Sequence, residues 1–411
     1  MKTILATAYA INPYKGSEDG TGWNYILQIA RLNKVIAITR KNNRPFIEKY
    51  INENQDELYR NMHFEYYDLP YWMRFWKRGG KGAMLYYYLW QLFMPVFIKK
   101  KKINFDIAHN LNFHNDWTPT MLWMTGKPVI WGPVGHHPSI PKQFLLPIYG
   151  LKAYLKDRRL WILKNMFWYL DPMLRLSVAK ADIILAMNSS VPKVLRTKQS
   201  KIRMIKSVSS ENVELTNKNK INFNILSVGR FVPLKGFDLT IRSFVSFYKG
   251  LTNEQKNKVK LILVGDGPEL PLLEKIISEE NISEAIQIIH WLERSKLTEI
   301  YCDASIFLFP SHEGAGMVVP EALSYSLPVV CLANYGPGEF VTDECGIRVE
   351  AKEYKKTIID LADAMKKLFE NTELFATMAL QARKRFDEYF DWNVKAKILN
   401  DFYEEIYLKN E

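Results

Sequence analysis

Cysteine is scarce in this 411-residue chain, and no long apolar segment occurs in it. The three cysteines, Cys302, Cys331 and Cys345, form no CxxC pair, which argues against a disulfide framework or a zinc knuckle and fits a reducing compartment. The uncharged run of residues 82–98, which no other uncharged run exceeds in length, contains Tyr, Gln and Pro and is shorter than the about 20 apolar residues of a membrane span. We therefore expect no transmembrane helix.

Several motifs of nucleotide and metal chemistry are also missing. No GK[ST] of a Walker loop is present, and the stretch GDGPEL lacks the third glycine of a dinucleotide fingerprint, because Leu270 stands in its place. No Asp-x-Asp pair occurs anywhere in the chain, which argues against a diphosphate held by a divalent metal ion. We therefore expect neither a metal site nor a resident cofactor.

Acidic residues are few in the first half of the chain. Residues 1–210 hold 13 acidic and 32 basic side chains, a net charge of +19, whereas residues 211–411 carry a net charge of −7. Nine of the 11 tryptophans also lie in the first half. The overall charge of +12 is thus an average of two unlike halves, and the first half is suited to an anionic or interfacial partner.

Apolar runs of four to eight residues recur along the chain, each followed by a loop and then by a helical pattern. This alternation predicts parallel sheets with helices on both faces, and hence two doubly wound α/β domains. The polar stretch 198–220 is the expected crossover between them. The expected strands are Thr3–Ala8, Val35–Thr39, His63–Tyr67, Ile107–His109, Val129–Trp131 and Ile183–Met187, then Asn224–Val228, Lys260–Val264, Ile286–Ile289, Ile306–Phe309 and Val329–Leu332.

Polar and glycine-rich loops follow the first expected strand of each domain. Gly16 lies in the loop KGSEDGTGW, where backbone amides near a helix N-terminus would favour an anion. Arg230 and Lys235 lie in VGRFVPLKG, where a guanidinium fork and a mobile ammonium group would converge on a phosphate. The alternatives are a tight turn for the first loop and solvated charges for the second.

The stretch PSHEGAGMVVPEAL is the most specific motif. Glu313 follows the expected strand Ile306–Phe309, and Glu321 lies near the start of the next helix, where Pro and a carboxylate are favoured. The two carboxylates would bracket a ligand, with amides between them. The intervening loop and helix start contain Gly314, Gly316, Met317, Val318 and Val319.

Taken together, GSEDGTGW, VGRFVPLKG, LVGDGPEL and HEGAGMVVPEALSYSLPVV resemble the retaining glycosyltransferases of family 4. The resemblance covers nearly the whole chain, and the seven residues between Glu313 and Glu321 match the E-x7-E motif of that family. It implies an α/β, GT-B fold with two Rossmann-like doubly wound domains facing a central cleft. It also implies a nucleotide-linked sugar, UDP- or GDP-linked, as the donor substrate.

The resemblance further implies a role for each matching residue. Arg230 and Lys235 would neutralise the donor diphosphate, and Gly16 would approach it from the other domain. Glu313 and the amides of Gly314 and Gly316 would hold the sugar ring. The amides of Met317, Val318 and Val319 would bind the phosphate, and Glu321 would bind the ribose hydroxyls. Placed cations and amides lower the barrier most when charge grows on the leaving diphosphate.

The histidines depart from the family pattern. Many members carry a D-x-x-H-x-H string, but here Asp106 and His109 are followed by Asn110 and Leu111, so the second histidine is missing. His109, with His136 as the other candidate, is then the expected acceptor-side histidine. His109, His114, His136 and His137 cluster near the ends of two expected strands. A metal site made by these four histidines is disfavoured, because no carboxylate at a suitable spacing completes it.

Two basic and aromatic stretches, residues 71–102 and 144–170, suggest contact with an anionic membrane surface. Trp, Tyr and Phe beside Arg and Lys suit the headgroup region of a bilayer. The alternative is an aromatic core with a solvated basic face. Nucleic acid is a weaker explanation, because none of its binding signatures is present.

We therefore expect residues 1–205 to form an acceptor-binding domain, residues 206–392 to bind the donor, and the helix of residues 393–411 to pack back on the first domain. The expected activity is hexose transfer, with retention, to a saccharide or a lipid-linked saccharide in cell-surface polysaccharide or glycolipid synthesis. We expect this on the inner face of the cytoplasmic membrane. A sugar-nucleotide epimerase of the same fold and a non-catalytic membrane- or polysaccharide-binding protein are the alternatives.

Overall fold

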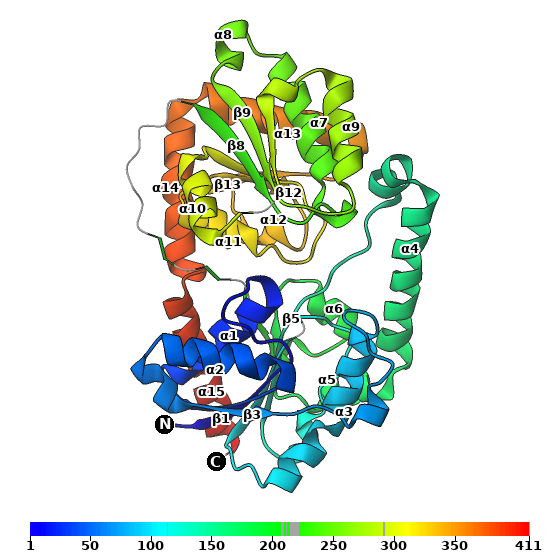
Figure 1. Ribbon diagram of the computed structural model, residues 1–411, viewed down its shortest axis with the longest axis vertical. Helices are drawn as coiled ribbons and strands as arrows, with labels where there is room; N and C mark the ends of the chain where they lie inside the picture. The colour runs from blue at the N-terminus through cyan, green and yellow to red at the C-terminus, as the bar shows by residue number, and fades with distance from the viewer. Residues whose placement is uncertain (113, 207–208, 211, 214–221, 291, 411) are drawn as a thin grey trace. The chain divides into compact units, whose positions relative to one another are not determined.

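The chain forms two compact units in a computed structural model that describes residues 1–112, 114–206, 209–210, 212–213, 222–290 and 292–410 (Figure 1). Unit 1 consists of Met1–His136, Ile162–Ser207 and Trp392–Glu411. Unit 2 consists of His137–Trp161 and Val208–Asp391.

Unit 1 is built on a seven-stranded parallel sheet with the order β3-β2-β1-β4-β5-β6-β7. The strands are rich in Ile, Val and Ala, and most of their side chains are buried, as expected for a sheet covered on both faces. The strands are β1 Thr3–Ala8, β2 Lys34–Thr39, β3 Met62–Tyr66, β4 Ile107–Asn112, β5 Val129–Val134, β6 Ile183–Ala186 and β7 Ile202–Met204.

Helices of unit 1 connect successive strands and complete its core. The last helix of the chain, α15, packs on this unit through Trp392, which meets Tyr25 edge to face, and through the buried Leu399 and Tyr403. The helices are α1 Ser17–Ala30, α2 Arg44–Glu53, α3 Ala83–Lys101, α5 Pro172–Lys180, α6 Val191–Leu195 and α15 Trp392–Asn410, with short 3-10 turns η1 Lys41–Asn43, η2 Glu57–Asn61, η3 Tyr71–Met73, η4 Leu122–Thr125 and η5 Gln199–Lys201.

Unit 2 is built on a six-stranded parallel sheet with the order β10-β9-β8-β11-β12-β13. This is the doubly wound order in which the chain direction across the sheet reverses between the first and fourth strands, here β8 and β11. The strands are β8 Phe223–Val228, β9 Val259–Val264, β10 Ile286–Ile289, β11 Ile306–Phe309, β12 Val329–Leu332 and β13 Gly346–Val349.

The helices of unit 2 bury apolar stripes against this sheet. Phe237, Phe244 and Met365 are among the residues that fill the core between α7, α13 and the strands. The helices are α7 Phe237–Lys249, α8 Asn253–Lys256, α9 Leu270–Glu280, α10 Arg294–Asp303, α11 Val318–Ser324, α12 Pro337–Phe340, α13 Tyr354–Glu370 and α14 Thr372–Tyr389, with turns η6 Pro233–Lys235 and η7 Ser283–Ala285.

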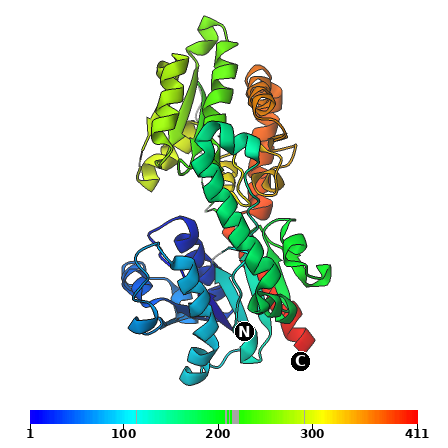
Figure 2. The same cartoon turned by 90° about the vertical axis from the view of Figure 1, so that its right-hand side faces the viewer.

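The assignment of residues 1–205 to one N-terminal domain is corrected by the structure, because residues 137–161 belong to unit 2. They form a loop and the first part of α4 (Lys142–Leu170), which is interrupted at Gly150, where φ is +77° (Figure 2). Phe144 is buried in the core of unit 2, and Tyr149 donates a 2.6 Å hydrogen bond to Asp238. Tyr354 donates a second hydrogen bond to the Asp238 carboxylate, at 2.8 Å. The burial of Phe144 and the hydrogen bond from Tyr149 to Asp238 therefore hold this segment to unit 2.

All eleven predicted strands are confirmed, and each begins within one residue of its predicted start. Two further strands, β7 and β13, were not predicted. β7 has three residues and lies in the polar stretch that was assigned to the crossover, and β13 has four residues and includes Arg348. Short edge strands of this kind carry little apolar pattern.

Candidate functional site

The most specific motifs follow β8 and β11, which are hydrogen-bonded neighbours in the sheet of unit 2. The carboxyl ends of parallel strands lie at one edge of the sheet, and ligands bind there at the point where the strand order reverses. In unit 2 this point lies between β8 and β11. The loop with Lys235 and the loop with Glu313 therefore meet at the position where the fold favours a ligand.

Lys235 and Glu313 form an ion pair across these two loops. The Nζ of Lys235 lies 2.6 Å from Oε2 of Glu313, and the two side chains are only 19% and 9% exposed. The ammonium group also lies 5.1 Å from the centre of the Phe309 ring. The Oε1 atom of Glu313 is buried and has no hydrogen-bond partner among the described residues. Burial raises the pKa of the Glu313 carboxyl, and the Lys235 ammonium opposes that rise.

Close backbone contacts fix the two loops against each other. Gly236 has a φ of +69°, and a Cβ at this position would lie 2.2 Å from the carbonyl oxygen of Pro310, so that only glycine fits without a shift. The amide of His312 donates to the carbonyl of Leu234 at 2.8 Å, and the Ser311 hydroxyl donates to the same oxygen at 3.0 Å. Lys235 is therefore held beside Glu313 by the backbone on both sides.

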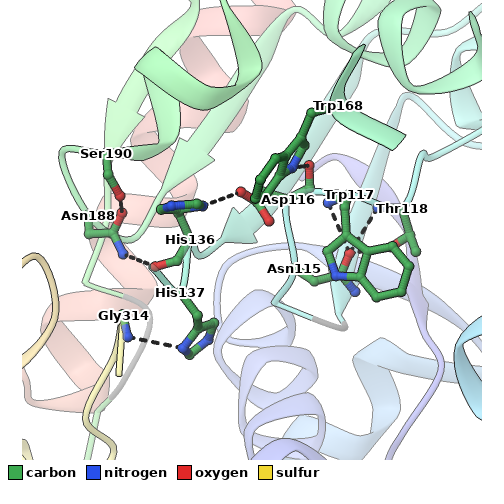
Figure 3. Close-up of polar contacts among 10 residues, drawn as sticks. All are labelled: Asn115, Asp116, Trp117, Thr118, His136, His137, Trp168, Asn188, Ser190 and Gly314. Atoms are coloured by element: carbon green, nitrogen blue, oxygen red, sulfur yellow. Dashed lines mark hydrogen bonds and ion pairs between the residues drawn. The ribbon is translucent and has the colours of Figure 1, made fainter. Parts of the chain in front are cut away.

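The glycine-rich part of the Glu313 loop leads directly into α11. The amide of Gly314 donates to Nδ1 of His137 at 3.0 Å, so that residue 137 contributes to the site of unit 2 (Figure 3). Met317 is the N-cap of α11, and Val318 is its first residue. Glu321 lies in the first turn of this helix and accepts a 3.1 Å hydrogen bond from the Tyr301 hydroxyl. The sequence identified His137 as part of a histidine cluster but assigned it no role at the donor site.

The other predicted donor-site residues are more exposed. Arg230 follows β8, is exposed, and has no side-chain partner in the described part of the chain. Gly16 is exposed and is the N-cap of α1 in unit 1. Among the described residues, neither the Arg230 guanidinium nor the Gly16 amide donates a hydrogen bond.

The assignment of His109 as an acceptor-side histidine is corrected by the structure. The residue is fully buried in unit 1. Its Nδ1 lies 2.6 Å from the Tyr403 hydroxyl, and its Nε2 lies 2.8 Å from the carbonyl of Gly132. Burial lowers the pKa of His109 to about 4. Both ring nitrogens are thus used within the core, and the residue joins α15 to the sheet.

The second histidine candidate, His136, lies in a polar cluster at the end of β5. Its Nδ1 lies 2.6 Å from Oδ2 of Asp116, and its carbonyl accepts a 2.9 Å hydrogen bond from Asn188 (Figure 3). The indole of Trp168 donates to the carbonyl of Asp116 at 3.1 Å, and its ring centre lies 5.3 Å from that of His136. Asp116 therefore fixes the orientation of the His136 ring.

A further pair in unit 1 was not predicted. Glu18 lies in the first turn of α1, and its Oε1 is 4.0 Å from Nδ1 of His114. Burial raises the pKa of Glu18 to about 7 and lowers that of His114 to about 4. Oε2 of Glu18 and Nε2 of His114 are buried without a partner among the described residues. These residues follow β1 and β4, where the strand order of unit 1 reverses, and that topology was the signal that could have identified them.

The aromatic stretches divide between core and surface. In the first stretch, Tyr86, Tyr87 and Trp90 are buried, whereas Tyr71 and Trp72 are 74% and 71% exposed. In the second stretch, α4 buries Phe144 and Trp168 but exposes leucines and isoleucine, namely Leu151, Leu155, Leu160, Ile162, Leu163 and Leu170. Among the described helices, none has both the length and the apolarity that crossing a membrane requires.

Comparison with known proteins gives one family match. Residues 209–385 match the model of the glycosyl transferases group 1. This segment includes the loops of Lys235 and Glu313 and most of unit 2.

Curated relatives are similar over part of their length. An alpha-monoglucosyldiacylglycerol synthase from Acholeplasma laidlawii is 31% identical over 109 residues, which are 26% of this chain and 26% of that protein. The alpha-1,3/1,6-mannosyltransferase ALG2 of Mus musculus is 26% identical over 186 residues, which are 43% of this chain and 44% of that protein. The aligned regions thus span less than half of both relatives.

A solved structure is similar over the whole chain. The crystal structure of HepE from Anabaena in complex with UDP matches with a TM-score of 0.64 and 14% identity, covering 98% of this chain and 100% of that one. At this identity the similarity concerns the fold.

Proposed function

Because residues 209–385 belong to the group 1 glycosyl transferases and the chain has the GT-B fold, we propose that it transfers a hexose from a nucleotide-linked sugar. The donor is UDP- or GDP-linked, and the acceptor is a saccharide or a lipid-linked saccharide. The buried pair of Lys235 and Glu313 at the strand-order reversal of unit 2 is the observation that carries this proposal.

The pair suits a donor whose leaving group is a diphosphate. When the bond between sugar and phosphate breaks, negative charge grows on the phosphate oxygens, and cations already in position stabilise it. Lys235 is held beside that position by Gly236 and Glu313, and the exposed Arg230 adds a second cation. The amides of Met317 and Val318 at the start of α11 add further donors. The expected phosphate contact of the Val319 amide is not retained, because this amide already donates to the carbonyl of Gly316 at 2.9 Å. In this proposal, cations and amides act without a metal ion.

The remaining donor contacts follow from the same loops. Glu313 has an acceptor oxygen without a partner among the described residues, which suits a sugar hydroxyl, and Gly316 lies near it in the chain. The expected contact of the Gly314 amide with the sugar is not retained, because this amide already donates to His137. Glu321 would accept from the ribose hydroxyls, and Gly16 would approach the diphosphate through its amide. The acceptor's proton would pass to the leaving phosphate, with attack on the same face and retention of configuration. No protein nucleophile is needed for this step.

His136 replaces His109 as the acceptor-side histidine in this proposal. Asp116 accepts at Nδ1 of His136, and such a carboxylate sets the tautomer of the imidazole. His109 has no such role, because both of its nitrogens are bonded in the core.

We also propose that unit 1 contacts an anionic membrane surface, on the cytoplasmic side. The exposed Tyr71 and Trp72 lie in a segment that includes Arg74, Lys77 and Arg78, a combination that suits the headgroup region. The curated relative from Acholeplasma laidlawii is named as a synthase of a glucosyl diacylglycerol, which supports a lipid acceptor and a role in glycolipid or polysaccharide synthesis.

Incubation of the purified protein with a panel of UDP- and GDP-sugars and a crude lipid acceptor tests the proposal. Mass spectrometry should detect one nucleotide released for each sugar transferred. Lys235→Ala should lower the rate by at least about 100-fold, because it removes a cation from the leaving group. Lys249→Ala is the matched control, since its ion pair with Glu280 has the same 2.6 Å separation on an exposed surface. Donor turnover without any acceptor, or no turnover with every donor, would refute the transferase.

A further inference from the structure

A cavity of about 390 Å³ lies in unit 1 and is lined by residues between Trp168 and Lys201. It is formed by the end of α4, by α5 and by α6 with the turn that follows it. Its volume is within the range of small-ligand pockets, about 300 to 1,000 Å³. The lining residues are Trp168, Leu174, Arg175, Val178, Ala179, Val194, Leu195, Arg196, Thr197, Lys198 and Lys201.

The charge of this cavity is of one sign. Arg175, Arg196, Lys198 and Lys201 line it, and no carboxylate does. Arg175 donates to the carbonyl of Tyr169 at 2.7 Å, and Lys201 donates to the carbonyl of Ala181 at 2.8 Å. None of the four cations forms an ion pair with a residue that the structure describes. Neutral oxygens thus orient two of the four cations but leave their charge uncompensated, and this arrangement suits an anion.

The floor of the cavity is apolar. Trp168, Leu174 and Leu195 are buried, and Val178 and Val194 are partly exposed. The guanidinium of Arg196 lies 4.2 Å from the centre of the Tyr169 ring, which is itself 48% exposed. A free phosphate would satisfy the cations but leave this apolar floor unused. A molecule with a phosphate at one end and a hydrocarbon chain behind it would use both.

We propose that this cavity binds the phosphate end of a membrane amphiphile, with the phosphate among Arg175, Arg196 and Lys198 and the first part of the chain against Val178 and Val194. The choice of a membrane molecule rests on the proposed contact of unit 1 with a lipid surface. The floor residue Trp168 also bonds Asp116 and packs on His136. The cavity therefore adjoins the acceptor-side cluster, and a lipid held there is close to the residues that would receive an acceptor.

Binding of soluble amphiphiles, measured by isothermal titration calorimetry, tests the site without requiring turnover. Dihexanoyl phosphatidic acid and farnesyl phosphate represent the two lipid sources, and inorganic phosphate represents the free anion. Both amphiphiles should bind, and the one that binds more tightly identifies the source. Inorganic phosphate should bind at least tenfold more weakly. Equal affinity for inorganic phosphate would overturn the proposal, because the apolar floor would then contribute nothing.

Two charge-matched triple variants separate the cavity from general basicity. Arg175→Gln, Arg196→Gln and Lys198→Gln together should weaken amphiphile binding by about 100-fold, at about fivefold for each cation. The control triple Lys34→Gln, Lys41→Gln and Lys127→Gln removes three exposed cations of unit 1 that lie outside the cavity and outside both basic and aromatic stretches, and it should leave the affinity unchanged. An equal loss in both triples would overturn the site in favour of diffuse electrostatic attraction.

A floor variant provides the complementary test. Val178→Asp should weaken amphiphile binding at least tenfold, whereas Val178→Ile should keep it, since Val178 is only partly buried and both variants should fold. Hydrogen exchange of α5 peptides checks that the helix is intact. If Val178→Asp binds like the unmodified chain, the proposal is refuted. Loss of binding with intact sugar transfer to a soluble acceptor, or the reverse, distinguishes a failure of this site from a failure of the proposed activity.

Discussion

Replacing Lys235 with methionine should destabilise unit 2, and the loss should grow with pH. The substitution removes the counter-ion of Glu313, the more buried partner of a pair whose nitrogen and oxygen are 2.6 Å apart. Removing one partner of a buried pair costs about 3–5 kcal/mol, and the 19% exposure of the Lys235 side chain places the expected loss near the lower end. Glu313→Gln should lower the stability of unit 2 less, because the Lys235 ammonium group reaches water and keeps the amide oxygen of the new side chain as a hydrogen-bond acceptor.

The dependence on pH follows from the pKa of Glu313. Burial already raises this pKa, and Lys235 is the group that lowers it. Without Lys235 the pKa of the folded state rises further above that of the unfolded chain, about 4.3. Between these two values the folded state holds a proton that the unfolded state has lost. Stability therefore falls as pH rises, by up to about 1.4 kcal/mol for each pH unit, until the pH passes the pKa of the folded variant.

Urea unfolding at pH 6 and pH 8, with hydrogen exchange of peptides from β8 and β11, measures this effect within unit 2. Lys249→Met is the matched control, because its pair with Glu280 has side chains 57% and 27% exposed and should contribute about 0–1 kcal/mol at either pH. The reasoning is refuted if Lys235→Met and Lys249→Met lose the same stability, or if the loss in Lys235→Met is smaller at pH 8 than at pH 6.

Two other substitutions test how the site is supported. Tyr149→Phe should destabilise the α4 segment by about 1.5–3 kcal/mol, because it removes a hydrogen bond to the buried Asp238. Hydrogen exchange of peptides 142–156 measures this loss of stability. Unchanged protection of these peptides would contradict the assignment of the segment to unit 2. Gly236→Ala should cost about 1–3 kcal/mol, since φ is +69° and the new Cβ would lie 2.2 Å from the Pro310 oxygen. Thermal unfolding and the rate of sugar transfer measure it, and Gly250→Ala, where the nearest atom to a Cβ is 3.4 Å away, is the control.

The fold and the sheet edge that carries the site were predictable from local pattern. Apolar runs of four to eight residues indicate buried parallel strands, because both faces of such strands are covered. Once strands alternate with helices, the residues that follow β8 and β11 must lie at the same edge of the sheet. The direct ion pair between Lys235 and Glu313 was not predicted and is a finding of the structure.

The histidines were not predictable in the same way. His109 and His136 each lie at or beside the end of an apolar run, and nothing in their neighbours along the chain distinguishes them. The difference is made by distant residues. Tyr403, which is 294 positions away in the chain, is hydrogen-bonded to His109 in the core. Asp116 and Trp168 instead orient His136. Because the residue that contacts His109 is so remote in sequence, the apolar pattern around the histidine does not reveal the contact.

The sequence by itself therefore determined the α/β class, the two parallel sheets, the pairing of the two motif loops and the family resemblance, since each depends on residues close together along the chain. The tertiary structure decided which aromatic residues are exposed, which unit holds residues 137–161, which histidine is bonded to Tyr403 in the core and which to Asp116, and where four cations share one cavity. These properties depend on contacts such as Tyr149 with Asp238, which join segments far apart in sequence. Local pattern specifies the elements, and only long-range packing specifies what each side chain meets.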